Sequence, residues 1–167
     1  MLSKKMQAAL NDQINAELAS AYIYLAMAAW FEAENLPGSA SWMRRQAGEE
    51  VAHAMKIFDY VTDQDGRVVL AAVETPPKDY KDMADVWQKA LAHEQKVTGL
   101  IHALADLAAK EKDHATGALL QWFATEQVEE EKTARGILEQ ARMIKHSTAL
   151  YFLDRHLGKE AQKKEQK

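Results

Sequence analysis

The sequence predicts an all-α protein: a four-helix bundle with one long crossover and a short fifth helix at the C-terminal end. Three observations point to this fold. The 167 residues include only seven Gly and three Pro, which leaves long stretches without helix breakers. Apolar residues recur at helical spacing in four of those stretches. Short turn signals separate the stretches, except for one longer connection at 65–80. The pattern is typical of two antiparallel helical hairpins joined by a single crossover.

The first hairpin is expected from two helices separated by the segment "ENLPGSAS" at 34–41. A helix is predicted over 5–34, rich in Ala. Pro37-Gly38 is the predicted turn, and Ser39 or Ser41 is the candidate cap of the next helix. That second helix is predicted over 39–64, until Asp65-Gly66 interrupts it.

The second hairpin follows the crossover, which contains the adjacent prolines 76 and 77. At up to about 3.5 Å per residue, this connection can run the full length of the bundle. A third helix is predicted over 82–111 and a fourth from the turn at 110–116, with Asp113 as a possible cap, to about 145. A fifth, short helix is predicted over 147–158, closed by Gly158. We expect one domain, 1–158, followed by a polar, disordered tail at 159–167.

Composition excludes several classes of function. The absence of cysteine excludes disulfides, thiol catalysis and zinc–thiolate sites, and suits a cytoplasmic protein. The first residues, "MLSKKMQAAL", contain no apolar core of a signal peptide, and no run approaches the roughly 18 apolar residues of a membrane span. The net charge of −4 comes without a basic stripe, so we expect neither nucleic acid nor membrane as a partner.

Each of the four long predicted helices carries a glutamate in the middle of its apolar face. On the first helix, for example, Glu17 shares a stripe with Leu10, Ile14 and Tyr24. Any one such glutamate would be better explained as an exposed or salt-bridged residue, but a solvated run of charges would not follow the apolar stripe of four helices. The four residues are Glu17, Glu50, Glu94 and Glu130.

An internal repeat supports the same interpretation. A shift of 77 residues maps Glu17, Glu49, Glu50, Val51 and His53 onto Glu94, Glu126, Gln127, Val128 and Glu130. The two hairpins therefore resemble copies, with polar groups at matching depth near the middle of the bundle. Unpaired buried carboxylates are costly, so they must be protonated, paired with cations or bound to metal. No Lys or Arg lies near them on the four stripes, and a carboxylate-rich set with one imidazole suits iron or manganese.

Tyr24 lies one stripe position from Glu17 and could hydrogen-bond a ligand or donate an electron. Histidines 93, 102, 114, 146 and 156 have no matching partners and are expected at the surface or behind the ligands. The tryptophans at 30, 42, 87 and 122 are expected to pack in the core or at an interface.

With these features, the chain resembles the bacterial non-haem ferritins from residue 1 to about 158. The resemblance rests on "NAELASAYIYLAMAAWFE", "AGEEVAHAMKIFDYV", "HEQ" at 93–95 and "WFATEQVEEE" at 122–131. The donor arrangement is the one already known from ferritin-like di-iron bundles. The resemblance implies a cage of 24 subunits that oxidises Fe(II) with O2 or peroxide and stores a ferric oxyhydroxide mineral. The fifth helix would line the four-fold axes.

The resemblance also implies roles for individual residues. The first iron would be held by Glu17, Glu50 and His53. The second would be held by Glu50 as a bridge, with Glu94 and Glu130, and with Gln127 nearby. A third position towards the cavity would use Glu49, Glu126, Glu129 and Glu130. Tyr24 would assist catalysis.

Departures from related families narrow the prediction. Bacterioferritin repeats Glu-x-x-His in its second half and binds haem through a methionine. Here the second copy ends in Glu130, and Ala52 stands at the expected methionine position, with Met55 close by, so no haem is expected. Rubrerythrin would add cysteine ligands, which this chain lacks. The alternative function is a free-standing, dimeric di-iron or di-manganese oxidoreductase acting on a small organic substrate.

Overall fold

The computed structural model describes residues 2–165, and they form five helices and no strand. The helices are α1 (Lys4–Ala33), α2 (Pro37–Asp63), α3 (Met83–Glu111), α4 (His114–Arg142) and α5 (Ser147–Glu165). The predicted all-α class is confirmed. Among the described residues, none of the helices is long and apolar enough to cross a membrane.

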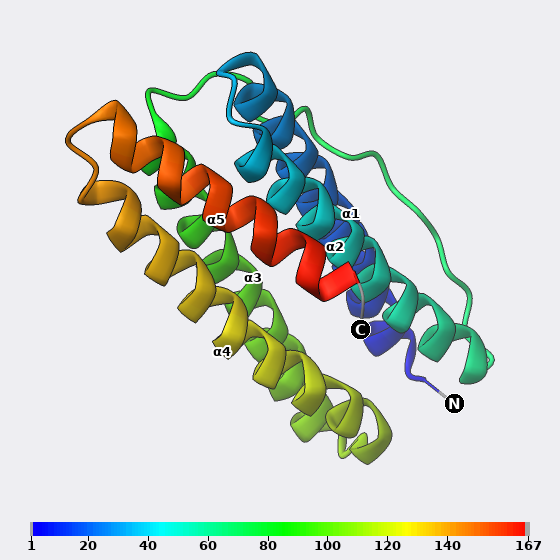
Figure 1. The fold of residues 1–167 in the computed structure, drawn as a ribbon. Coiled ribbons are helices and arrows are strands. Elements are labelled where there is room, and N and C mark those ends of the chain that lie inside the picture. Colours follow the sequence, from blue (N-terminus) through cyan, green and yellow to red (C-terminus); the bar gives the residue numbers. More distant parts are fainter. Residues whose placement is uncertain (1, 166–167) are drawn as a thin grey trace.

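Two antiparallel hairpins, α1–α2 and α3–α4, make up the bundle, and the crossover joins them (Figure 1). The crossover returns along the outside of the bundle from the end of α2 to the start of α3, so α2 and α3 run parallel. Asn11 and Asn15 of α1 hold it in place by donating side-chain amide hydrogens to the carbonyls of Arg67 and Ala72, at 3.1 and 3.2 Å. α5 lies across the bundle beside α2 and α4.

Three of the helices begin at an oxygen-bearing cap. Ser3, Asp82 and Asp113 each accept a hydrogen bond from the backbone N–H three residues later, which satisfies a donor that the first helical turn leaves unpaired. The prediction for Asp113 is confirmed. The turn before it places Lys112 at φ 57°, in the left-handed region.

The turn between α1 and α2 differs from the prediction. It lies at residues 34–36, with Asn35 at φ 59°, and Pro37 opens α2 instead of forming the turn. Proline fits the first helical position because its missing N–H would be unpaired there in any case. Leu36 precedes the helix, so neither Ser41 nor Ser39 is the cap. Ser39 has another role. Its N–H and hydroxyl both donate to Asp154 of α5, at 2.7 Å, and Gly38 N–H donates to the same carboxylate at 3.1 Å.

α5 is longer than predicted. It continues through Gly158 to Glu165, so the prediction of a disordered tail is wrong for residues 159–165; residues 166–167 lie outside the described part of the chain. Gly158 does not end the helix; it lies against Gly38, where an added Cβ would come within 3.0 Å of the Gly38 Cα. The helix continues because Ala161, one turn after the buried Leu157, extends its buried stripe beyond that contact.

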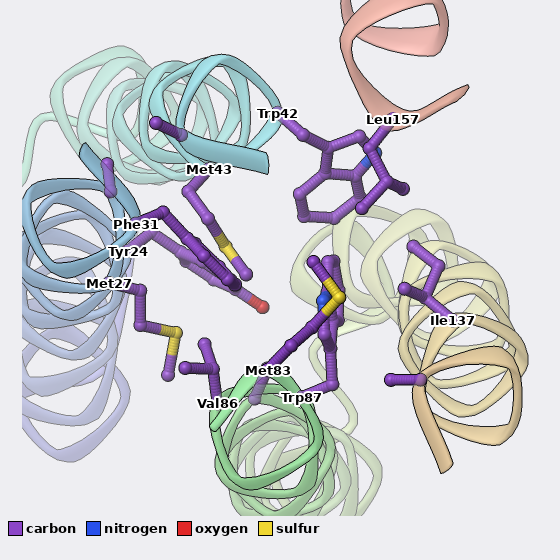
Figure 2. Close-up of a cluster of buried hydrophobic side chains, with 14 of the residues drawn as sticks. Tyr24, Met27, Phe31, Trp42, Met43, Met83, Val86, Trp87, Ile137 and Leu157 are labelled. Carbon is purple, nitrogen blue, oxygen red and sulfur yellow. The ribbon is translucent and has the colours of Figure 1, made fainter. Parts of the chain in front are cut away.

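The apolar core is divided into two clusters. One, here called the α5-side cluster, contains residues such as Phe31, Met43 and Trp87, and side chains from all five helices point into it (Figure 2). The other, the N-terminal cluster, contains residues such as Leu10 and Ile57. On every long helix the switch from one cluster to the other occurs at the predicted glutamate. A polar layer therefore separates the two halves of the core.

Candidate metal centre

The polar layer contains every glutamate that was predicted to face inward. Glu17, Glu50 and Glu94 are almost fully buried, and Glu130 is 9% exposed. His53 is also buried, one helical turn after Glu50 on α2. Helical periodicity explains this placement, since each glutamate continues the stripe that faces the other helices. The predicted inward orientation is confirmed.

Two groups of ligand atoms form within this layer. One ligand atom from each of Glu17, Glu50 and His53 lies within 4.8 Å of the other two, and so do atoms of His53, Glu126 and Glu130. His53 belongs to both groups. Its Nδ1 lies 3.4 Å from Glu50 Oε2, so imidazole and carboxylate face the same space. Three helices thus supply ligands around one histidine.

Glu94 belongs to neither group. Its carboxylate accepts a hydrogen bond from the hydroxyl of Tyr24 on α1, and another from Gln127 Nε2 on α4 at 3.1 Å. Tyr24 therefore hydrogen-bonds one of the predicted ligands, as the sequence suggested, and that ligand is Glu94. In this arrangement Glu94 is oriented from both sides, with Gln127 acting as a donor to it.

Two glutamines that were not predicted from the sequence also contact the buried glutamates. Gln13 donates to Glu17 Oε1 at 2.8 Å, and Gln46 donates to Glu50 Oε1 at 2.9 Å. Both are buried. Each glutamine lies four residues before its glutamate, one helical turn away, and this spacing could have identified them from the sequence. Hydrogen bonds of this kind fix the orientation of a metal-binding carboxylate.

Burial makes the carboxylates hard to ionise. Burial, together with the charge of neighbouring carboxylates, raises the pKa of Glu17, Glu50 and Glu130 from about 4.5 to about 8. The strongest neighbour is Glu50 for Glu17, and Glu94 for both Glu50 and Glu130. Burial likewise raises the pKa of Glu94 and, with Glu94 beside it, that of Tyr24. Near neutral pH, Glu17, Glu50 and Glu130 are therefore largely protonated when no cation is bound.

A bound cation would stabilise the ionised form of these buried carboxylates. In the part of the chain that the structure describes, no Lys or Arg forms an ion pair with Glu17, Glu50, Glu94 or Glu130. Glu17 Oε2 is buried and has no hydrogen-bond partner among the described residues. Such an orphaned oxygen fits a metal ligand, because a bound cation would replace the missing partner and favour the ionised form.

The residues predicted for a third metal position have different surroundings. Glu126 and Glu130 come together beside His53. Glu129 is 63% exposed, with its Oε2 3.8 Å from Lys132 Nζ, and Glu49 accepts a hydrogen bond from Arg45. The structure thus brings together half of the predicted set.

The chain matches the family model for the ferritin-like domain over residues 7–144. Among curated proteins, the bacterial non-heme ferritin of Bacteroides fragilis (strain 638R) is 39% identical over 158 residues, which cover 95% of this chain and 99% of that protein. The bacterial non-heme ferritin of Escherichia coli O157:H7 is 37% identical over 159 residues, with coverages of 95% and 96%. A solved structure described as an open pore ferritin from the archaeon Archaeoglobus fulgidus has a TM-score of 0.94 at 48% identity, covering 95% of this chain and 98% of its own.

Proposed function

Because the chain belongs to the ferritin-like family, we propose that it is the ferroxidase subunit of an iron-storage ferritin. The observation that carries this proposal is the buried layer of four glutamates and one histidine. Each of these glutamates other than Glu94 has its pKa raised to about 8, and Glu17 Oε2 has no hydrogen-bond partner in the described part of the chain. Buried carboxylates of this kind destabilise the metal-free fold, and bound divalent cations would neutralise them.

Ferrous iron is the substrate of this centre. We assign the first Fe(II) to Glu17, Glu50 and His53, whose ligand atoms already lie within 4.8 Å of one another. Glu50, Glu94 and Glu130 would hold the second. Hard carboxylate oxygens stabilise Fe(III) over Fe(II) and so favour oxidation by O2 or peroxide. Gln13, Gln46 and Gln127 hold the carboxylates in orientation.

A third iron position lies towards the storage cavity. We assign it to Glu49, Glu126, Glu129 and Glu130, of which Glu126 and Glu130 already converge beside His53. Glu129 is 63% exposed and Glu49 is 32% exposed, so both would offer a path out of the buried layer.

We further propose assembly into a cage of 24 chains. Several large apolar side chains on α1, α2 and the crossover are exposed, which supports burial against other subunits. They include Tyr22, Leu25, Val51, Met55, Val69 and Leu70. The family comparison does not favour the alternative function, a free-standing oxidoreductase that acts on a small organic substrate.

Iron loading followed by size-exclusion chromatography tests this function. The protein is loaded with Fe(II) in air, and iron is measured across the elution. Storage predicts that iron elutes with a particle of roughly 450 kDa, 24 chains of 18.8 kDa each, at far more ions per chain than the centre can hold. Two or three irons per chain in a dimer-sized particle would instead indicate a small di-metal enzyme.

A further inference from the structure

A cavity of about 330 Å³ lies between α2, α4 and α5, and the proposed iron chemistry does not use it. Its apolar wall includes Trp42 of α2, Ile137 of α4 and Leu157 of α5, all labelled in Figure 2. Arg45 of α2 and Lys132 of α4 also line it. Its volume is in the range of cavities that bind small molecules, and two cations lie beside its apolar wall.

Arg45 is the buried cation of this cavity. Its side chain is only 7% exposed, whereas that of the neighbouring Arg44 is 61% exposed. The guanidinium carbon of Arg45 lies 4.9 Å from the centre of the Trp42 ring, a contact that restricts its movement. A guanidinium buried to this extent loses most of its hydration, so its N–H groups depend on acceptors from the protein or from a ligand.

One edge of this guanidinium lacks acceptors. Within the described part of the chain, the Arg45 guanidinium forms one hydrogen bond, through Nη1 to Glu49. Its Nε is buried and has no hydrogen-bond partner among the described residues. Nε and Nη2 form the edge through which arginine binds two oxygens of one oxyanion. This edge is therefore available to a ligand, whatever else Glu49 contacts.

The other polar groups of the lining favour an anion. Lys132 is 73% exposed, and its Nζ lies 3.8 Å from Glu129 Oε2, the distance of a loose ion pair. Thr133, the next residue of α4, adds a hydroxyl group to the lining. Among the described residues, Glu160 is the one acid that lines the cavity, and it pairs with Lys163 Nζ at 2.7 Å. Positive charge therefore predominates around the cavity.

We propose that this cavity binds inorganic phosphate, held by the unpaired edge of Arg45 with Lys132 and the Thr133 hydroxyl on its other oxygens. A tetrahedral oxyanion presents oxygens in several directions, which suits donors that come from two helices. A planar carboxylate has only two oxygens and leaves one of these donors without a partner. The inference goes beyond the proposed function and does not depend on it.

Equilibrium dialysis of the metal-free protein against labelled phosphate, at about 0.1 M salt, tests the proposal. Removal of iron matters because ferric iron itself binds phosphate. We expect one phosphate per chain, bound at least about tenfold more weakly by Arg45→Gln. Arg45→Lys keeps the charge without the planar fork and should also bind more weakly. Arg44→Gln is the matched control, because it removes the same charge from an exposed position, and it should bind as wild type.

Two variants at exposed side chains keep the test decisive if the Arg45 variants do not fold. Lys132→Gln removes an attractive charge and should weaken binding about threefold. Glu160→Gln, at a side chain that is 41% exposed, removes a repulsive charge and should tighten binding about threefold. Glu139→Gln, at an exposed position of α4 outside the cavity, should change nothing. A damaged fold would not produce tighter binding.

Four results would overturn the proposal. They are no phosphate bound by the wild-type protein, equal affinities of Arg45→Gln and Arg44→Gln, unchanged affinities of both Lys132→Gln and Glu160→Gln, and displacement of phosphate by an equal concentration of acetate. The last result would show that the cavity takes any small oxyanion without selecting a tetrahedral one. Iron storage can succeed or fail in the same protein without changing these outcomes, because the dialysis uses no metal.

Discussion

Gln127 Nε2 donates to both the carboxylate and the backbone carbonyl of Glu94 on the facing helix, at 3.1 and 3.2 Å. The corresponding pair in the first hairpin is Glu17 and Glu50, where the second carboxylate raises the pKa of the first. The same two positions of the repeat thus hold two carboxylates in one hairpin and a carboxylate with a carboxamide in the other. This difference makes the two ends of the metal centre unequal.

Gln127→Glu should make the two halves alike. The second divalent ion should bind about tenfold more tightly or better, because another carboxylate faces it. The metal-free protein should lose about 1–3 kcal/mol of unfolding free energy at pH 8, since Glu94 loses a donor and gains a like charge. Co(II) titration and urea unfolding measure the two effects. Gln121→Glu, at an exposed position of the same helix, is the control and should change neither.

Glu17→Gln should impair metal binding without impairing folding. We expect initial Fe(II) oxidation to slow by about 10- to 100-fold, because one ligand oxygen is replaced by an amide. The metal-free fold should keep its stability at pH 8 or gain about 1 kcal/mol, since a buried ionisable group has been removed. Stopped-flow absorbance and thermal unfolding measure these effects. The exposed Glu139→Gln on α4 should behave as wild type; a Glu17→Gln protein with normal oxidation would contradict the assigned role.

Tyr24→Phe removes the hydroxyl that donates to Glu94. The protein should lose about 1–2 kcal/mol of stability, because a buried carboxylate keeps only its Gln127 partner among the side chains described. Fe(II) oxidation should also slow, since Glu94 is less well oriented. Chemical denaturation and oxygen consumption measure the effects, with the half-exposed Tyr22→Phe as the control. Equal behaviour of the two variants would show that the Tyr24 hydroxyl does not matter.

The stability of the metal-free protein should fall as the pH rises from about 5 to 8. Glu17, Glu50 and Glu130 have pKa values of about 8 in the folded state and about 4.5 when unfolded. Within this window the folded state holds more protons, so each step up in pH favours unfolding. Thermal unfolding across this range checks the prediction. Zn(II) should abolish the slope and release protons on binding near pH 7. A stability that rises over the same range would contradict the raised pKa values.

Gly38→Ala should detach α5 or force α2 to move. The new Cβ would lie 2.0 Å from the Asp154 carbonyl oxygen and disturb the three hydrogen bonds that Asp154 accepts from Gly38 and Ser39. We expect a loss of about 3 kcal/mol or more in thermal or urea unfolding. Gly136→Ala is the matched control: nothing lies within 4 Å of its added Cβ, and it should stabilise α4 by about 0.5–1 kcal/mol. Faster proteolysis within α5 of Gly38→Ala would confirm where the damage lies.

The metal-centre residues could be predicted because their positions follow the helical periodicity of the apolar residues. Glu17 and Glu94 continue apolar stripes, and a carboxylate on such a stripe must face the other helices whatever the details of packing. The repeat then places the polar groups of both hairpins at the same depth. The burial of Glu17, Glu50, Glu94 and Glu130 follows from these two facts alone.

Partners across helices were not predictable in the same way. Nothing in the spacing of Tyr24 distinguishes Glu17 from Glu94, and only the packing of α1 against α3 decides that its hydroxyl reaches Glu94. The end of α5 was also misjudged. Gly158 usually signals a helix end, but close contact with Gly38 uses its small size instead.

The sequence by itself determined the helices, the single crossover and the inward carboxylates, because these depend on periodicity along one chain. The tertiary structure decided which glutamates converge on His53, how Asp154 joins α5 to α2, and that Arg45 is buried while Arg44 is exposed. Burial and hydrogen bonding between distant segments depend on where whole helices come to rest, and local spacing carries no information about that.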